Sequence, residues 1–253
     1  MPSPSADIRP IADADVGTTE RPLLTWVDDV TGERVDLSAS ELWRKAAQTT
    51  HLLRGECGLR AGDRLAALLP PHWQTAAVLL GAWFAGITVS YRPWATAGLP
   101  HPDDVPATPF DAVVVSRERL RSWLEKVPEA RHRFVVDLDG AGLADVPPDY
   151  RDFVAAVAAM PELPPAREPR RRTDAASPDG ISYQQWGELA RGVADKLGLC
   201  EGDRVLVDVS RTEQPVMWLL APLSVGASIV LCANLDRSAL DERKASEGAT
   251  HVL

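Results

Sequence analysis

The chain has 253 residues, 45% of them hydrophobic, and its formal net charge is −9 at pH 7. This length and composition allow a buried core, either in one large α/β domain or in two halves of about 100 to 125 residues each, and they exclude disorder throughout. Because an acidic surface repels phosphate groups, the charge argues against nucleic acid as a partner.

Cysteine usage and hydropathy indicate the compartment. Cys57, Cys200 and Cys232 show no CxxC spacing, and the N-terminal residues lack the basic and apolar regions of a secretion signal. The longest apolar stretch, residues 75–89, falls short of the roughly 20 residues that a membrane span needs. The histidines are not arranged at metal-ligand spacing. We therefore expect a cytoplasmic protein with no membrane partner and no metal site.

In chain order, residues 1–20 form a polar tail, and residues 23–37 form a predicted β-hairpin. Ser38 and Glu41 have the spacing of a capping box, and the apolar residues after them recur at helical spacing, which predicts a helix over residues 39–54. The elements predicted after this helix are strands at 64–69, 87–90, 111–116, 133–137, 204–209, 227–231 and 250–253, and helices at 73–85, 117–127, 182–197, 214–225 and 238–248.

A repeat relates two parts of this pattern. Residues 58–90 align without a gap with residues 198–230, and nine of the 33 aligned positions are identical. Each copy has the sequence Gly-Leu-x-x-Gly-Asp-Arg before a strand, a helix and a second strand, an order that is typical of parallel sheets with crossover helices. The predicted fold class is therefore α/β, with two similar, mainly parallel sheets flanked by helices and related by the internal repeat.

The helix before each Gly-Asp-Arg turn is amphipathic, and we expect its apolar face to be buried. On the first helix this face comprises Leu42, Ala46, Thr49 and Leu53. On the second helix it comprises Trp186, Leu189, Val193 and Leu197.

Two Pro-rich stretches, residues 92–109 and 161–180, interrupt the alternation of strands and helices. The first is a long loop where a helix would be expected, and the second is the predicted boundary between the halves. The predicted organisation is a flexible tail at 1–20, a first α/β subdomain at 21–160, a Pro- and Arg-rich linker at 161–180 and a second α/β subdomain at 181–253.

The order of these motifs resembles the opening of the adenylate-forming superfamily, which comprises acyl-CoA synthetases and peptide-synthetase adenylation domains. The resemblance rests on the capping box with its helix, Gly-Leu-Arg-Ala-Gly-Asp-Arg-Leu at 58–65, Val-Val-Val-Ser-Arg-Glu-Arg-Leu at 113–120 and Arg-Phe-Val-Val-Asp at 133–137. It covers most of residues 24–253. It implies the paired N-terminal subdomains of that superfamily, in a truncated and degenerate relative.

In that superfamily a phosphate loop rich in Thr, Ser and Gly, with a Lys, precedes the helix that begins here at Ser182, and its donors bind the phosphates of ATP. The corresponding residues 173–180 contain one glycine, no lysine and two carboxylates, which would repel a triphosphate. Residues 209–214 lack the histidine that the superfamily carries after the same strand. Its adenine, ribose and catalytic-lysine segments lie beyond the position matched by Leu253. The resemblance thus implies a scaffold without the groups that stabilise phosphoryl chemistry.

We assign no catalytic residue. The candidate cofactor-binding residues are polar groups of the connector and of the end of a predicted strand: Thr173, Ser177, Gly180, Asp208 and Arg211. Asp208 stands near the carboxyl end of a parallel strand, where open α/β sheets bind ligands. Exposure of this carboxylate at the sheet edge is the interpretation that the sequence favours.

Three functions stay open at this point. The chain could be a non-catalytic binding or interaction module. It could be an enzyme of altered or reduced type that binds ATP, AMP, CoA or an acyl group between the subdomains and, if active, performs an AMP-forming ligase-like reaction. It could also be a half-enzyme completed by a second copy or a partner protein that covers the strand edge where the sequence ends.

Overall fold

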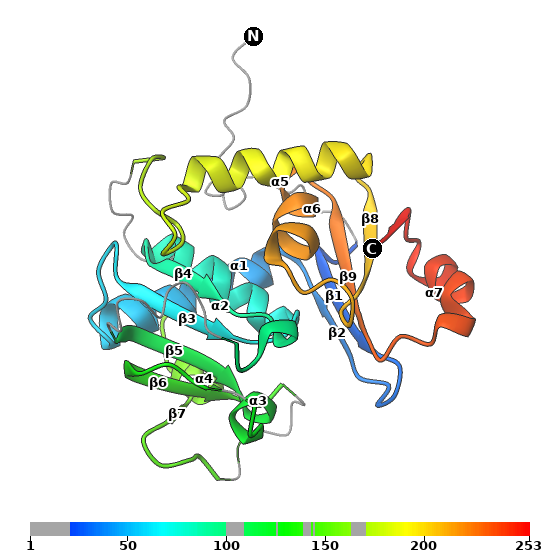
Figure 1. The fold of residues 1–253 in the computed structure, drawn as a ribbon. Helices are drawn as coiled ribbons and strands as arrows, with labels where there is room; N and C mark the ends of the chain where they lie inside the picture. Colours follow the sequence, from blue (N-terminus) through cyan, green and yellow to red (C-terminus); the bar gives the residue numbers. More distant parts are fainter. Residues whose placement is uncertain (1–20, 100–108, 125, 139–142, 144, 163–170) are drawn as a thin grey trace. The chain divides into compact units, whose positions relative to one another are not determined.

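The computed structural model describes residues 21–99, 109–124, 126–138, 143, 145–162 and 171–253 (Figure 1). The predicted tail and residues 163–170 of the predicted linker lie outside this set. Within the described residues, the chain forms two five-stranded sheets with helices between the strands. The predicted α/β class with two mainly parallel sheets is therefore confirmed.

One sheet has the strand order β4-β3-β5-β6-β7, and its neighbouring strands are all parallel. The strands are β3 (Arg64–Leu68), β4 (Thr88–Tyr91), β5 (Phe110–Ser116), β6 (Ala130–Val136) and β7 (Arg151–Asp152). The helices in this part of the sequence are α1 (Ala39–His51), the π-helix η2 (Leu52–Glu56), α2 (Trp73–Ala85), the 3-10 helix η3 (Trp94–Thr96), α3 (Arg117–Arg121) and α4 (Phe153–Ala158). Residues 112–115 of the central strand β5 are fully buried, as is typical of a parallel strand covered on both faces.

The other sheet has the strand order β10-β8-β9-β1-β2, and only the β1–β2 pair is antiparallel. The strands are β1 (Leu24–Asp28), β2 (Arg34–Leu37), β8 (Arg204–Asp208), β9 (Ser228–Ala233) and β10 (His251–Val252). The helices that connect them are α5 (Tyr183–Leu197), the π-helix η5 (Val216–Leu220), α6 (Ala221–Ser224), the 3-10 helix η6 (Arg237–Ala239) and α7 (Leu240–Glu247).

The β1–β2 hairpin pairs with β9, although the sequence placed it in the first subdomain. Leu24 lies opposite Ile229, and the Ile229 N–H donates to the carbonyl of Leu23 (2.8 Å). Residues 229–232 are fully buried. A buried strand needs hydrogen-bond partners on both of its edges, and β8 supplies only one of them. The hairpin supplies the other, so the first predicted subdomain loses its first two strands to the second sheet.

The chain divides into two compact units, each holding one sheet. The C-terminal unit comprises Tyr183–Leu253, Pro71–Trp73 and the described residues up to Trp43. The middle unit comprises Arg44–Pro70 and the described residues of Gln74–Ser182. The division differs from the predicted boundary at the linker, because the hairpin and the described end of the linker change sides.

Helices cover both faces of the sheet in the C-terminal unit (Figure 1). Leu206, Val230 and Cys232 form a buried cluster with Ala249, which follows α7, and Leu240, the first residue of α7, packs against this cluster. Because side chains alternate along a strand, the buried residues between them point to the opposite face. The helix α6, which follows β8, covers that opposite face. The helix α7, which follows β9, covers the face of the Leu206 cluster. The connections after β8 and β9 therefore leave the sheet in opposite directions.

The two aligned segments make the same turn before their strands. The glycine of each Gly-Asp-Arg donates its N–H to the glycine that precedes the next strand, Gly62 to Gly86 (2.8 Å) and Gly202 to Gly226 (3.4 Å). All four have positive φ, between 77° and 92°, a conformation that residues with a Cβ rarely adopt. The two stretches of sequence thus share these glycines for a common backbone reason.

The aspartates of the two turns also have matching roles. The Asp63 carboxylate accepts the N–H of Arg60 (2.8 Å), and the Asp203 carboxylate accepts the N–H of Cys200 (2.7 Å). The backbone carbonyls of Asp63 and Asp203 each accept an N–H from the first residue of the second strand of their segment. These residues are Thr88 in β4 and Ser228 in β9, and the distance is 2.8 Å in both cases. These aspartates therefore close the turns between each helix and its strand.

The helices show where the two segments differ. The predicted helix at 73–85 is α2, with the same bounds, but the predicted helix at 214–225 is a π-helix followed by α6. Pro222 lies in α6 and has no N–H for the carbonyl of Trp218, so a regular α-helix cannot continue through this point. Within the described part of the chain, no helix is both long and apolar enough to cross a membrane.

Of the two predicted apolar helix faces, one is confirmed and the other is wrong in part. Leu42, Ala46, Thr49 and Leu53 are all buried. On α5, however, Leu189 is 46% exposed, and the buried residues are Tyr183, Gly187, Ala190 and Ala194. Small side chains let α5 pack closely against η5 and α6, and the larger apolar residues flank that contact.

Candidate functional site

The connector before α5 forms a narrow hairpin. The Ala176 N–H donates to the carbonyl of Ile181 (2.8 Å), and Ala175 and Ser182 form an antiparallel bridge beside this bond. The turn between the two arms holds Ser177, whose carbonyl accepts the N–H of Gly180 (3.0 Å). The connector therefore has a defined backbone where the sequence predicted only a linker.

This hairpin is attached to the middle unit. The Ala176 carbonyl accepts the backbone N–H of Val89 in β4 (2.9 Å) and the indole N–H of Trp83 in α2 (3.2 Å). Since β4 is an edge strand of its sheet, the hairpin supplies an acceptor that the edge would otherwise lack. The described end of the predicted linker is thus part of a folded unit.

The carboxylates of the connector accept hydrogen bonds from the connector itself. Asp179 accepts the hydroxyl of Ser177 and the N–H of Ile181 (3.3 Å), and Asp174 accepts the N–H of Arg171 (2.9 Å). A phosphate loop offers hydroxyl and backbone donors to the phosphates. Here an internal carboxylate takes donors of this kind, and its negative charge opposes an entering phosphate. The residues of the connector do not fit the triphosphate of ATP.

Asp208 is the centre of a second polar cluster, in the C-terminal unit. It is the last residue of β8, and its side chain is 5% exposed. Its carboxylate accepts the N–H (3.0 Å) and the hydroxyl (2.6 Å) of Ser210 and a hydrogen bond from the guanidinium of Arg237. Nε of Arg211 lies 4.0 Å from Oδ2 of the same carboxylate. The exposed-edge interpretation of Asp208 is therefore wrong, because the side chain is buried and hydrogen-bonded.

The cluster keeps Asp208 ionised. Burial raises the pKa of this carboxyl, but the hydrogen bonds from Ser210 and Arg237 outweigh burial, and the pKa lies below its ordinary value of 3.8. A carboxylate that is charged at neutral pH can orient the two arginines continuously. The guanidinium groups themselves reach solvent, since the side chains of Arg211 and Arg237 are 66% and 48% exposed.

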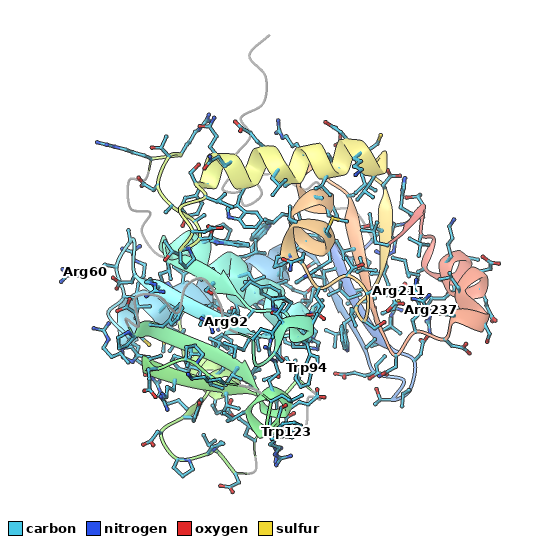
Figure 2. All side chains as sticks on the ribbon, in the orientation of Figure 1. Arg60, Arg92, Trp94, Trp123, Arg211 and Arg237 are labelled. Atoms are coloured by element: carbon cyan, nitrogen blue, oxygen red, sulfur yellow. The ribbon has the colours of Figure 1, made fainter. Side chains whose placement is uncertain are left out.

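Arg237 is the member of this cluster that sequence reasoning missed. It lies 29 residues after Asp208, in η6, the short 3-10 helix after β9. The available signal was the register of the sheet, because the carboxyl ends of neighbouring parallel strands meet, and Asp208 pairs with Cys232 near the end of β9. Figure 2 shows Arg211 and Arg237 together at this end of the sheet.

The five predicted binding residues therefore separate into two groups. Asp208 and Arg211 lie together in the C-terminal unit, while Ser177 and Gly180 form the turn of the connector in the middle unit. Thr173 is exposed at the start of the connector. Within the described residues, no group of three His, Cys, Asp or Glu side chains could hold a metal ion.

Comparisons with known proteins identify what the chain is similar to. No family model matches the sequence. The chain is 36% identical over 240 residues to a TIGR03089 family protein of Mycobacterium tuberculosis, and the alignment covers 92% of this chain and 91% of that protein.

Two solved structures of synthetases share the fold. Acetoacetyl-CoA synthetase from Streptomyces lividans has a TM-score of 0.73 at 20% identity, with 97% of this chain and 42% of the synthetase covered. An acyl-CoA synthetase of Brucella canis has a TM-score of 0.74 at 20% identity, with 97% and 46% covered. The chain thus spans less than half the length of these two synthetases.

Proposed function

Given that the chain belongs to the TIGR03089 family and has the fold of the N-terminal part of acyl-CoA synthetases, we propose that it is a non-catalytic relative of these enzymes that acts as a binding or interaction module. The observation that carries the proposal is the connector hairpin, in which Asp179 accepts the donors of Ser177 and Ile181. Phosphoryl chemistry depends on donors and cations that hold the phosphates. This connector offers a carboxylate instead.

A pyrophosphate-release assay tests the non-catalytic role. The purified chain is incubated with MgATP and a panel of short, long, branched and aromatic carboxylic acids, and we expect no release that depends on the acid. Ser177→Ala and Arg211→Gln variants purified in parallel control for contaminating enzymes. Acid-dependent release by the wild type that either variant lacks would show that the chain is an enzyme.

Binding of a nucleotide, acyl or CoA ligand is the second candidate function, as in an enzyme of altered type. It is favoured by the Asp208 cluster, because a buried carboxylate holds one exposed arginine in a hydrogen bond and lies 4.0 Å from another at the carboxyl end of a parallel sheet. Thermal unfolding in the presence of millimolar ATP, AMP, CoA and acyl-CoA tests this role. A rise in Tm with one of them supports it, and unchanged unfolding with all four counts against it.

Association with a second copy or a partner protein is the third candidate. The observation that favours it is the edge position of β10, where Val252 is 40% exposed. Sedimentation velocity over a range of concentrations tests self-association, and a monomer at all of them would exclude a homodimer.

Cys57, Cys200 and Cys232 are all free, which supports the expected cytoplasmic location of this module.

A further inference from the structure

We propose that Arg211 and Arg237 bind one oxyanion group of a small ligand, a phosphate or a carboxylate, at the carboxyl end of β8. The inference rests on the proposed binding role and names the chemistry of the ligand. Asp208 is the positioning residue of this site, because it touches both arginines and its buried carboxylate offers a ligand no surface of its own.

The charge of the cluster favours an anion. Both arginines approach the same atom, Oδ2 of Asp208, so two positive groups share one negative group. In the described structure Arg237 gives Asp208 one nitrogen of its guanidinium, and Arg211 makes only the 4.0 Å ion pair. The side chains of Arg211 and Arg237 are both exposed to solvent, so a ligand can reach their guanidinium groups. Guanidinium groups bind phosphates and carboxylates through paired N–H donors, and an oxyanion between them would also reduce their mutual repulsion.

Other carboxylates at this end of the sheet are already engaged. Asp29 forms an ion pair with Arg243, and Asp28 accepts the side-chain amide of Asn234. Asp236 accepts the N–H and the hydroxyl of Ser238. Of these three carboxylates, Asp29 is paired with a cation, while Asp28 and Asp236 accept hydrogen bonds from neutral groups and keep their negative charge.

The topology of the sheet places the cluster where ligands bind in open α/β folds. The connection after β8 leads to α6 on one face, and the connection after β9 leads to α7 on the other face (Figure 1). Loops that diverge from neighbouring parallel strands open a crevice at their carboxyl ends. Arg211 follows β8 and Arg237 follows β9, so one arginine comes from each side of this divergence.

The aligned segment in the middle unit shows that the fold does not require these polar residues. At the positions of Asp208, Ser210 and Arg211 it has Leu68, Pro70 and Pro71. Leu68 is fully buried in an apolar cluster with Ala66, Val113 and Val115. The corresponding strand end in the middle unit thus has a buried apolar residue in place of the carboxylate. The carboxylate and the arginines of the C-terminal unit need another reason, and anion binding supplies one.

Titration calorimetry of the full chain with inorganic phosphate and, separately, with acetate tests the site and distinguishes the two sources. We expect saturable binding of one of them. Arg211→Gln and Arg237→Gln should each weaken it by roughly tenfold, the loss of one charge-assisted hydrogen bond. Arg237→Lys should have an intermediate affinity, because it keeps the charge and loses the paired donors.

Arg60→Gln is the matched control. Arg60 is an exposed arginine of the middle unit (Figure 2), so this variant changes the net charge equally and should bind like the wild type. The site is overturned if neither anion binds saturably, or if both arginine variants bind as the wild type does. Either result leaves the non-catalytic role standing, because the pyrophosphate assay tests that role independently. Circular dichroism confirms that each variant is folded.

Discussion

The segment from β3 to β4 and the segment from β8 to β9 share a backbone plan and differ at one end. Both begin with a Gly-Asp-Arg turn whose glycine and aspartate make corresponding hydrogen bonds. At the carboxyl end of the first strand the middle unit has Leu68 in an apolar core, and the C-terminal unit has Asp208 among arginines. The turns preserve the fold, and the strand ends are free to differ in chemistry.

Exchanging the residues at the two strand ends should lower the free energy of unfolding by unequal amounts, and the largest loss is expected for a substitution of Leu68. Leu68→Asp puts a carboxylate among Ala66, Val113 and Val115, where the apolar cluster offers it no partner. The cost of an uncompensated buried charge is about 4 kcal/mol of the free energy of unfolding. Urea denaturation measures it. A loss below about 1 kcal/mol would mean that the strand end in the middle unit tolerates polar groups as the other one does.

The second largest effect is expected at Glu247, which has no counterpart in the middle segment. Its buried carboxylate accepts hydrogen bonds from Arg34 (2.6 Å) and from the buried Arg204 (3.3 Å), joining the hairpin, β8 and α7. Glu247→Gln should lower the free energy of unfolding by about 3 kcal/mol, since it leaves the buried Arg204 without the anion of its ion pair. Asp36→Asn, at an exposed partner of Arg34, should cost less than about 1 kcal/mol.

The same carboxylate gives the stability a pH dependence. Burial raises the pKa of Glu247, but the hydrogen bonds from Arg34 and Arg204 outweigh it, and the pKa lies below its ordinary value of 4.5. Its stabilising contribution is therefore present above pH 4.5 and is lost as the pH falls through the lower, folded-state pKa. The unfolding midpoint of the wild type should fall steeply below this pH, and that of Glu247→Gln should fall less.

The turn glycines should give a smaller effect that is equal in the two segments. Gly62→Ala and Gly202→Ala each force a Cβ into a left-handed conformation, at φ of 92° and 84°. Each should cost about 1 to 2 kcal/mol of stability. If chemical denaturation gave values that differed by more than this amount, the two turns would not be equivalent in energy despite their matching hydrogen bonds.

Asp208→Leu should have a smaller effect on stability than the glycine substitutions, about 1 kcal/mol, because the arginines that lose their carboxylate can be hydrated. Its effect on phosphate or acetate binding should be larger than its effect on unfolding, since Arg237 loses its anchor. Asp208→Asn, which keeps the shape, separates the charge from the volume. A severe loss of stability in Asp208→Leu would instead make the cluster a structural element.

Local patterns predicted most of the elements, although α3 ends at Arg121 and not at the predicted residue 127, and they predicted the pairing between distant elements poorly. The helix at 73–85 and the capping box of Ser38 and Glu41, with its 2.8 Å hydrogen bond, follow from adjacent residues. The pairing of Leu24 with Ile229 depends on which buried strand lacks a neighbour, and no local pattern carries that information. Leu189 was expected in the core, but close helix packing selected the small residues of α5.

The candidate site was likewise predicted where local patterns sufficed and missed where it depends on the pairing of strands. Asp208 and Arg211 were found because a polar residue interrupts a predicted buried strand, and Arg237 was missed because its role depends on the register between β8 and β9. The composition of the connector indicated that it does not match a phosphate loop. Its hairpin geometry and the bonds of Asp179 could not be read from composition, because they depend on which donors the folded backbone brings to the carboxylate.

Equilibrium dialysis of the full chain against radiolabelled MgATP tests the central claim most directly, since the claim is that the connector cannot hold the phosphates of ATP. Up to about 1 mM, the upper end of typical Michaelis constants, we predict no saturable binding that Ser177→Ala or a substitution at Gly180 weakens. Saturable binding below that concentration that Ser177→Ala or a substitution at Gly180 weakens would contradict the account, because the connector would then be a working phosphate site.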